Sequence, residues 1–394
     1  MKGIILKRIF AVAVVSFALL SFLCGDVYRV GAEAVAYGEE LNESILNQLG
    51  QLDLKALEEY VNGLGGFSDE SVIERLYRYI RGQSFDFEGF IEQFLAVVAG
   101  NVQELLPPFA CIMAITLLCG ILSTLKSNFL SDSTAEVVFM VAYIGALIPL
   151  LAVLTECFSS VKSSVSSMQE QMQIVFPIML TLMAASGGTV SVAIYRPAVA
   201  FLSSSLVSLI DTVVLPITLT VLVFSTAGHL FPDLKLGRFT AFFKSINKWI
   251  MGVGVSVFGV FFTVQGITSA TYDGIARRAA KYAIGTGVPI VGGFLSGGFD
   301  LAVAGSALIK NSLGTMSVFM LLAVIAEPLV LLLAVNLLLR FTSAVTQPFG
   351  GGKISDFLAE TADHLNYCLA GLLFTAFLYF VCILLIVCST EAFF

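Results

Sequence analysis

The sequence predicts an all-α, polytopic helical membrane protein with an N-terminal signal peptide and a short extracytoplasmic region of amphipathic helices. Hydrophobic residues make up 57% of the 394 positions and charged residues 12%, about half the charged share of an ordinary soluble domain. The mean hydropathy is +0.93. Apolar segments of about 20 residues, the length that crosses a bilayer core as helix, recur along the chain.

The first 34 residues are predicted to be a secretory signal peptide. Basic residues in the first eight positions precede an apolar run from Ile9 to Cys24, and small residues follow at Ala32 and Ala34, where signal peptidase would cleave. The alternative is that residues 1–34 stay as an uncleaved anchor. In both cases the chain that follows is expected to begin outside the cytoplasm.

Residues 37–104 are predicted to form an acidic extracytoplasmic region of short helices. The region holds thirteen acidic side chains against four basic ones, and its apolar residues recur at helical spacing. Gly63, Gly65 and Gly66 end one helix, and Ser71 with Glu74 forms a capping box for the next. Such short helices bury little by themselves, so they are expected to pack on the membrane part, on a partner or flat at the interface. The charges are interpreted as a solvated face.

Residues 105–394 are predicted to form a membrane domain of seven to eight spans. Seven segments have the required length and composition: Leu105 to Leu125, Val137 to Cys157, Ile174 to Tyr195, Ala198 to Gly228, Trp249 to Ala270, Leu313 to Leu339, and Leu365 to Val387. The glycine-rich segment 284–309 is the eighth, either as a straight span or as a re-entrant segment. Polar connectors are expected between spans, among them the serine-rich segment 158–173, the turn Tyr195-Arg196-Pro197 and segment 340–364.

Two features of the predicted spans stay open at this point. The helix from Ala198 contains Pro216 and is expected to be either kinked or broken. Basic residues collect in both connectors that flank Trp249 to Ala270, so the excess of positive charge in cytoplasmic loops does not orient this span. Phenylalanines interleaved with lysines in segment 235–248 suit a helix lying at the membrane interface.

Three acidic residues fall within predicted spans: Asp211, Asp300 and Glu327. A charged side chain at a helix centre costs about 2.5–3.5 kcal/mol on insertion scales. These residues are therefore expected to face a protein interior or a water-filled cavity, or to be protonated. They are candidate transport or relay groups, and the alternative is that they form interhelical hydrogen bonds that orient packing.

The glycine-rich stretch VGGFLSGGFDLAVAGSALIKNSLG is predicted to be a close-packing element. Gly293, Gly297, Gly298 and Gly305 give it a face of small residues against which a neighbouring backbone can lie closely. The stretch resembles a phosphate loop only superficially, because Ile309 stands where a glycine should precede Lys310.

The sequence supports no catalytic residues, cofactor or metal. The histidines, His229 and His364, are far apart in the chain and have no cysteine or second histidine at a metal-ligand spacing, so a zinc site and a Ser-His-Asp triad are both disfavoured. No basic surface for nucleic acid is present. We therefore expect a protein that is not an enzyme.

Several stretches of the chain resemble one known family. They are the signal-like N-terminus before an acidic helical region, Tyr195-Arg196-Pro197, the glycine-rich stretch above, and EPLVLLLAVNLLLRFTSAVTQPFGGGKISDFL from Glu327 to Leu358. Together they are similar, over most of the chain, to the stage III sporulation protein AE family of endospore-forming bacteria.

The resemblance implies a membrane subunit of a multi-protein, secretion-system-like channel that links mother cell and forespore and sustains forespore development. It implies a location in the mother-cell membrane that surrounds the forespore. The expected partners are the other membrane subunits, the lipid bilayer and a separate cytoplasmic ATPase. The rival hypothesis is a stand-alone secondary transporter that uses Asp211, Asp300 and Glu327.

Overall fold

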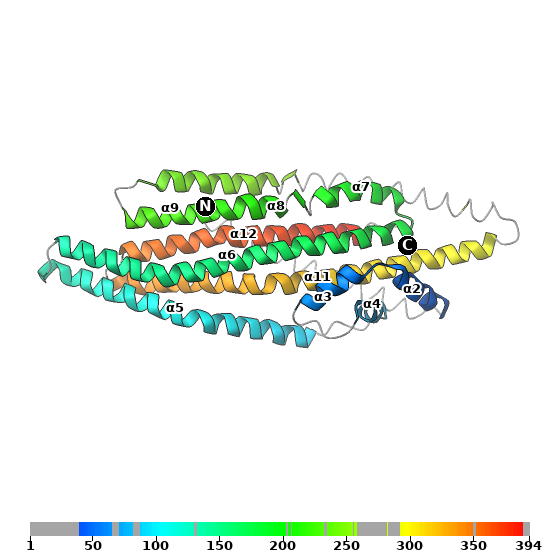
Figure 1. Ribbon diagram of the computed structural model, residues 1–394, viewed down its shortest axis with the longest axis horizontal. Coiled ribbons are helices and arrows are strands. Elements are labelled where there is room, and N and C mark those ends of the chain that lie inside the picture. Colours follow the sequence, from blue (N-terminus) through cyan, green and yellow to red (C-terminus); the bar gives the residue numbers. More distant parts are fainter. Residues whose placement is uncertain are drawn as a thin grey trace.

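The computed structural model describes residues 39–64, 71–81, 87–129, 132–201, 204–205, 207–231, 235–254, 256–257, 282, 292–349 and 352–388. These residues form helices and turns and contain no strand, which confirms the all-α prediction for this part of the chain. Figure 1 shows an elongated bundle of long helices lying side by side. The predicted signal peptide and most of the span predicted at Trp249 to Ala270 lie outside the described residues.

The body of the bundle consists of α5 (Phe87–Phe129), α6 (Asp132–Ala185), α11 (Gly292–Thr346) and α12 (Gly352–Cys388). The other elements are α2 (Glu39–Gln51), α3 (Lys55–Gly63), α4 (Val72–Ile80), α7 (Thr189–Phe201), α8 (Val207–Leu209), η2 (Ile210–Val214), α9 (Leu215–Leu230), the helical residues 237–254, and η3 (Gln347–Phe349). Five helices of the described part are long and apolar enough to cross a membrane. This finding supports a multi-pass membrane protein, and the number of spans stays a prediction.

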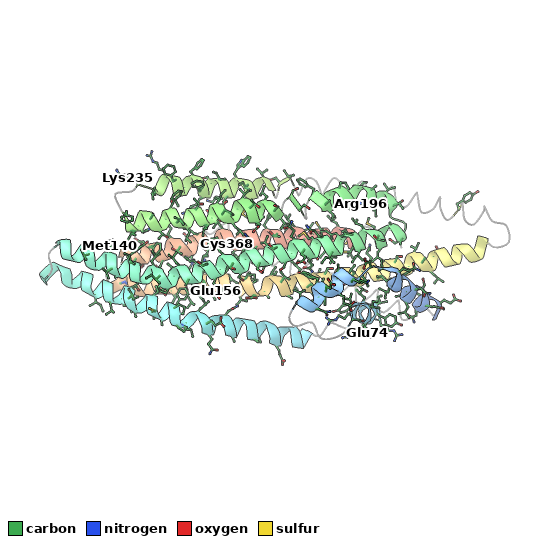
Figure 2. All side chains as sticks on the ribbon, viewed as in Figure 1. Glu74, Met140, Glu156, Arg196, Lys235 and Cys368 are labelled. Carbon is green, nitrogen blue, oxygen red and sulfur yellow. The ribbon has the colours of Figure 1, made fainter. Side chains whose placement is uncertain are left out.

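The bundle has two different ends. α5 and α6 meet at one of them, which we call the hairpin end, whereas α2, α3 and α4 lie toward the other (Figure 1). Figure 2 places Met140 and Lys235 near the hairpin end, and Glu74 and Arg196 toward the opposite end. α6 runs away from the hairpin end and α11 runs back toward it.

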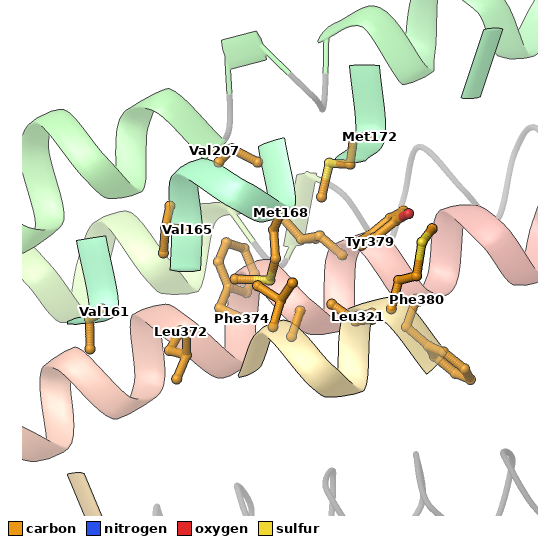
Figure 3. Packing of buried hydrophobic residues seen from close by; sticks show 14 of the residues in the cluster. Val161, Val165, Met168, Met172, Val207, Leu321, Leu372, Phe374, Tyr379 and Phe380 are labelled. Atoms are coloured by element: carbon orange, nitrogen blue, oxygen red, sulfur yellow. The ribbon is translucent and has the colours of Figure 1, made fainter. Parts of the chain in front are cut away.

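A single helix, α6, covers the span predicted at Val137 to Cys157, the connector after it and the first half of the span predicted at Ile174 to Tyr195, which the end of α6 at Ala185 divides. The serine-rich segment 158–173 is helical throughout, so the prediction of a connector there is wrong. Val161, Val165 and Met168 recur on one helical face and are fully buried, because this face packs on α11 and α12 (Figure 3). The segment is polar because its opposite face is exposed, and the helix continues through it.

The chain reverses after α6 at Ser186 to Gly188. The predicted turn at Tyr195-Arg196-Pro197 is wrong, because these residues lie within α7. Gly187 has a φ of 92°, and the backbone N–H groups of Gly187 and Gly188 donate to the carbonyls of Ala184 and Met183. This pattern is a Schellman motif, whose left-handed residue is usually glycine because a Cβ would be strained there.

The long helix predicted from Ala198 is not a regular α-helix throughout. π-helical residues Ile210–Val214 precede α9, and Pro216 lies in the first turn of α9. Between Val207 and Leu230 the helix is irregular but continuous, because the N–H of Leu215 donates to the carbonyl of Ile210 where η2 meets α9.

α11 is one unbroken helix from Gly292 to Thr346. The described part of the glycine-rich segment and the span predicted at Leu313 to Leu339 therefore belong to the same helix. The helix is about 80 Å long, far more than the roughly 30 Å of a bilayer core. Most of the connector predicted at 340–364 is also helical, and the chain reverses around η3. The helices continue through these predicted connectors because α11 packs on α12, α6 and α5 there.

The N-terminal helices dock on the bundle through their apolar faces. Leu49, Leu57 and Leu76, one from each helix, are completely buried. Tyr60 donates from its hydroxyl to the carbonyl of Ser167 on α6 at 3.0 Å. Burial, together with the nearby Glu170 carboxylate, raises the pKa of Tyr60, which keeps the phenol protonated as the donor. The predicted cap of α4 is present, since Ser71 Oγ accepts from the N–H of Glu74 at 3.3 Å.

Candidate functional site

The three acidic residues predicted as intramembrane groups do not lie together. Asp300 and Glu327 both belong to α11 and are separated by about 40 Å of helix. Glu327 is exposed on the surface of the bundle, so it does not face the interior of this chain. Asp211 lies in the π-helical segment, and its Oδ1 is buried without a hydrogen-bond partner among the described residues. The structure therefore offers no single site built from these three groups.

The predicted small-residue face of α11 contacts the N-terminal region at Gly305. A Cβ at this position would lie 3.0 Å from Nε2 of Gln48 on α2. Gln48 donates from Nε2 to the carbonyl of Ala302 at 3.1 Å and accepts from Ser306 Oγ at 2.8 Å. Gly293, Gly297 and Gly298 lie in the first turns of the same helix.

Replacing Gln48 by alanine is expected to loosen α2. The change removes both hydrogen bonds to α11 and leaves the Ala302 carbonyl without this donor, at a cost of about 1–2 kcal/mol. Limited proteolysis of the purified protein measures the effect as faster cleavage within α2. Gln51, exposed on the same helix, is the matched control, and equal sensitivity of the Gln51→Ala and Gln48→Ala variants would contradict the assignment.

Charged side chains from three helices meet around Glu360 of α12, and we call this group the Glu360 cluster: His229, Lys244, Glu360 and His364. Lys244 Nζ lies 3.1 Å from Glu360 Oε1, and His364 Nε2 lies 3.5 Å from the same oxygen. His229 Nε2 lies 3.7 Å from Glu360 Oε2. The histidines, far apart in the sequence, therefore share one carboxylate in the folded chain.

The hydrogen bond of His229 to the backbone decides how its ring can meet Glu360. His229 Nδ1 lies 2.8 Å from the carbonyl of Ser225, and a carbonyl only accepts, so Nδ1 carries a hydrogen. Nε2 then faces the carboxylate either as a bare acceptor or, in the charged ring, as a donor. The contact of Nε2 with Glu360 joins α9 to α12.

A second polar group continues the Glu360 cluster along α11 and α12. The Arg340 guanidinium donates to Asp363 Oδ1 at 2.8 Å and to Asn336 Oδ1 at 2.8 Å. Asn336 in turn donates to the carbonyl of Ala362 at 2.7 Å and to Asn366 at 3.2 Å. Polar side chains within apolar helices therefore pair with one another across the helix interface.

The Glu360 cluster suits charge pairing rather than metal binding. Lys244 already supplies a cation to the carboxylate, which disfavours a metal ion at the same oxygens. Among the described residues, no three metal-ligating side chains are arranged to hold an ion. The arrangement can hold α9, the helical residues 237–254 and α12 together.

The Lys244–Glu360 contact is expected to couple the two helices energetically. In a double-mutant cycle with Lys244→Met and Glu360→Gln, a coupling free energy of about 0.5–1 kcal/mol is expected, because both side chains are still partly open to solvent. Thermal unfolding in detergent measures the cycle. Lys248→Met with Glu360→Gln is the control, because Lys248 is exposed on the same helix, and equal coupling in both cycles would refute a specific pair.

Only part of the Glu360 cluster could be predicted from local spacing. Glu360 and His364 are four residues apart and so share a face if the segment is helical. Segment 340–364 is predicted to be a connector rather than a helix, so the contact between these two side chains is not predicted. The contacts to Lys244 and His229 cross 116 and 131 residues of chain, which no local pattern reveals.

Comparison with known proteins gives one family. The family model described as Stage III sporulation protein AE matches residues 72–390. A curated Bacillus subtilis (strain 168) protein named Stage III sporulation protein AE is 25% identical over 332 residues, which are 84% of this chain and 79% of that relative. No solved structure matches the chain. The resemblance read from the sequence motifs is confirmed.

Proposed function

Because the chain belongs to the stage III sporulation protein AE family, we propose that it is an integral membrane subunit of a multi-protein, secretion-system-like channel that links mother cell and forespore. In this role it is required for forespore development during endospore formation. Its site of action is the mother-cell membrane that surrounds the forespore, with the N-terminal helices on the extracytoplasmic side.

The observation that carries the proposal is the extent of the family match. It runs from the start of α4 to beyond the end of α12, so it includes every helix of the described part that could cross a membrane. The shared unit is therefore the membrane bundle together with a docked N-terminal helix. A protein that is mostly membrane helix acts through contacts between helices, which suits a subunit of an assembly.

The proposal assigns the energy source and the remaining channel wall to other chains. The sequence has no phosphate-binding loop, so a separate cytoplasmic ATPase would drive the assembly. The partners in the bilayer would be other membrane subunits. α2, α3 and α4 dock on α6 and α11 and turn their charged faces outward, where a partner on the extracytoplasmic side could contact them.

The distribution of acidic residues favours the channel subunit over the stand-alone transporter. A transporter needs its substrate or coupling-ion groups at one place near the middle of the membrane. Asp300 and Glu327 are about 40 Å apart along α11, and Glu327 is exposed.

Deletion of the gene in an endospore former tests the proposed function. Engulfment is expected to finish and forespore development to stop afterwards, and a copy of the gene at another locus should restore spores. Normal spores from the deletion strain would contradict the proposal. Complementation with Asp300→Asn and Glu327→Gln adds a second comparison, because the transporter hypothesis alone requires both carboxylates.

A further inference from the structure

We propose that the lipid bilayer encloses only the half of the bundle at the hairpin end. The other half of α6 and α11 then stands outside the membrane with α2, α3 and α4, and the Glu360 cluster lies near mid-depth of the hydrocarbon layer. This placement concerns how the bundle sits in a membrane and is independent of the proposed channel role.

The exposed face of α6 changes character partway along the helix. From Val137 to Leu151 its large exposed side chains are apolar, and Ile148 is 67% exposed. Beyond Leu151 the exposed positions are mostly polar or charged: Thr155, Glu156, Ser159, Lys162, Ser163, Ser166, Glu170 and Gln173. Such a switch is expected where a helix leaves hydrocarbon and enters water.

The antiparallel neighbour α5 switches at the same level. Its exposed side chains are apolar from Leu106 to Ile121, while Gln103 and Glu104, farther from the hairpin end, are exposed and polar. A Cβ at Gly145 would lie 3.8 Å from Ile115, which aligns the middles of the two apolar stretches. Two helices of opposite direction therefore leave the apolar zone together.

The apolar zone continues around the bundle. Tyr143 of α6 donates to the carbonyl of Thr226 on α9 at 3.1 Å, which places the end of α9 at the same level. Large apolar side chains exposed there, on α9, on the helical residues 237–254 and on α11, are Leu219, Val223, Phe231, Phe239, Phe242, Leu337 and Phe341. Trp249 and Leu333 lie at the edge of the zone, because Asn247 donates to Thr218 Oγ1, two turns of α9 before Thr226. Outside this zone the exposed large hydrophobic residues of the described part are Leu46, Ile73, Leu95, Val102, Phe201, Val253, Val257 and Tyr282.

The height of this zone fits a bilayer core. It extends over about 22 Å on α5 and on α6 and over about 15 Å on residues 239–249, against a hydrocarbon thickness of roughly 30 Å. The apolar residues of α11 before Leu321 and of α12 beyond Leu372 are instead mostly buried within the chain, where the two helices pack on each other and on α6, and where α2 and α4 cover α11. These apolar side chains pack in the protein core, so their burial does not require lipid.

The same alignment gives the depth of the charged groups. Phe357 packs against Tyr143 with the rings tilted and their centroids 5.0 Å apart, so Glu360, about one turn farther along α12, lies level with the middle of the α6 apolar stretch. Gln171 donates to the carbonyl of Ser317 at 3.1 Å, which places Glu327 level with the polar face of α6. The intramembrane charges are thus Lys244, Glu360 and their neighbours rather than Glu327 or Asp300.

Fluorescence quenching by lipid tests this placement, because Trp249 is the sole tryptophan of the chain and is 71% exposed. The full-length protein is reconstituted in phosphatidylcholine vesicles with or without bromine on the acyl chains. In two double variants Trp249 is replaced by phenylalanine and a new tryptophan is placed on α6. One variant combines Trp249→Phe with Ile148→Trp, and the other combines Trp249→Phe with Ser163→Trp. Brominated lipid should quench the native protein and the Ile148→Trp variant severalfold and leave the Ser163→Trp variant unchanged, whereas aqueous iodide should show the reverse order.

Equal quenching of both variants by brominated lipid would overturn the placement, as would strong iodide quenching of the Ile148→Trp variant. A thermal midpoint equal to that of the Trp249→Phe protein confirms that each variant is folded. Ser166→Trp, on the same exposed face of α6, replaces Ser163→Trp if the latter does not fold. A negative result would leave the sporulation phenotype of the deletion strain unaffected, so the two proposals are tested separately.

Discussion

Replacing Gly314 by leucine is expected to prevent the native packing of α11, and replacing it by alanine to lower the free energy of unfolding by about 1–3 kcal/mol. A Cβ at this position would lie 2.5 Å from Val387 Cγ2 and 3.4 Å from Met179 Cε. Val387 belongs to α12 and Met179 to α6, so the added atom would enter the place where three helices meet. Thermal unfolding of the purified protein in detergent measures the loss.

Gly145 supplies the control for this prediction. It also lies inside a long helix, but the nearest atom to a Cβ there would be Ile115 Cδ1 at 3.8 Å, an ordinary van der Waals distance. Gly145→Ala is therefore expected to be neutral or to stabilise by up to about 1 kcal/mol through helix propensity. If both alanine variants unfold at the same temperature, the close approach of α11, α12 and α6 at Gly314 does not contribute to stability.

Replacing Lys310 by alanine is expected to lower the free energy of unfolding by about 3–5 kcal/mol. The side chain is completely buried, and Nζ donates to the carbonyls of Ile386 at 3.0 Å and Val387 at 2.8 Å. These carbonyls belong to the last turn of α12, where the helix itself provides no N–H donors. The ammonium also lies favourably at the negative end of the helix dipole. Unfolding in detergent again gives the measurement.

Lys310→Met separates the hydrogen bonds of Lys310 from its packing. Methionine keeps most of the apolar stem and loses the charge, so a smaller decrease of about 1–3 kcal/mol is expected. Lys162, exposed on α6, is the control, and Lys162→Met should change stability by less than about 0.5 kcal/mol. A Lys310→Met protein as stable as the native one would mean that the contacts to α12 add no net stability.

Gly314 and Lys310 lie at the end of the glycine-rich stretch, which gives this stretch a concrete structural role. Both contact the last turn of α12, and Gly305 in the same stretch contacts α2. One continuous helix therefore joins the N-terminal region to the C-terminal helix. Variants there should impair sporulation through lost folding, so protein level must be measured beside any phenotype.

Much of the fold was predictable because it depends on composition and on local spacing. Apolar segments of membrane length predicted a helical membrane protein, and Ser71 with Glu74 predicted the cap of α4. The sequence predicts close helix packing at Gly293, Gly297, Gly298 and Gly305. Gly314 escaped notice because its small size matters only against Val387 and Met179, which are distant in the sequence.

The sequence by itself determined the helical class, the membrane character, the acidic N-terminal helices and the family, since each of these follows from composition, periodicity or motif. Only the tertiary structure decided where helices stop. The serine-rich segment of α6 continues as helix because Val161, Val165 and Met168 face a neighbour, and polarity alone cannot tell such a face from a loop. Tertiary structure also assembled the Glu360 cluster, because contacts between charged side chains more than a hundred residues apart depend on helix packing and leave no periodic trace.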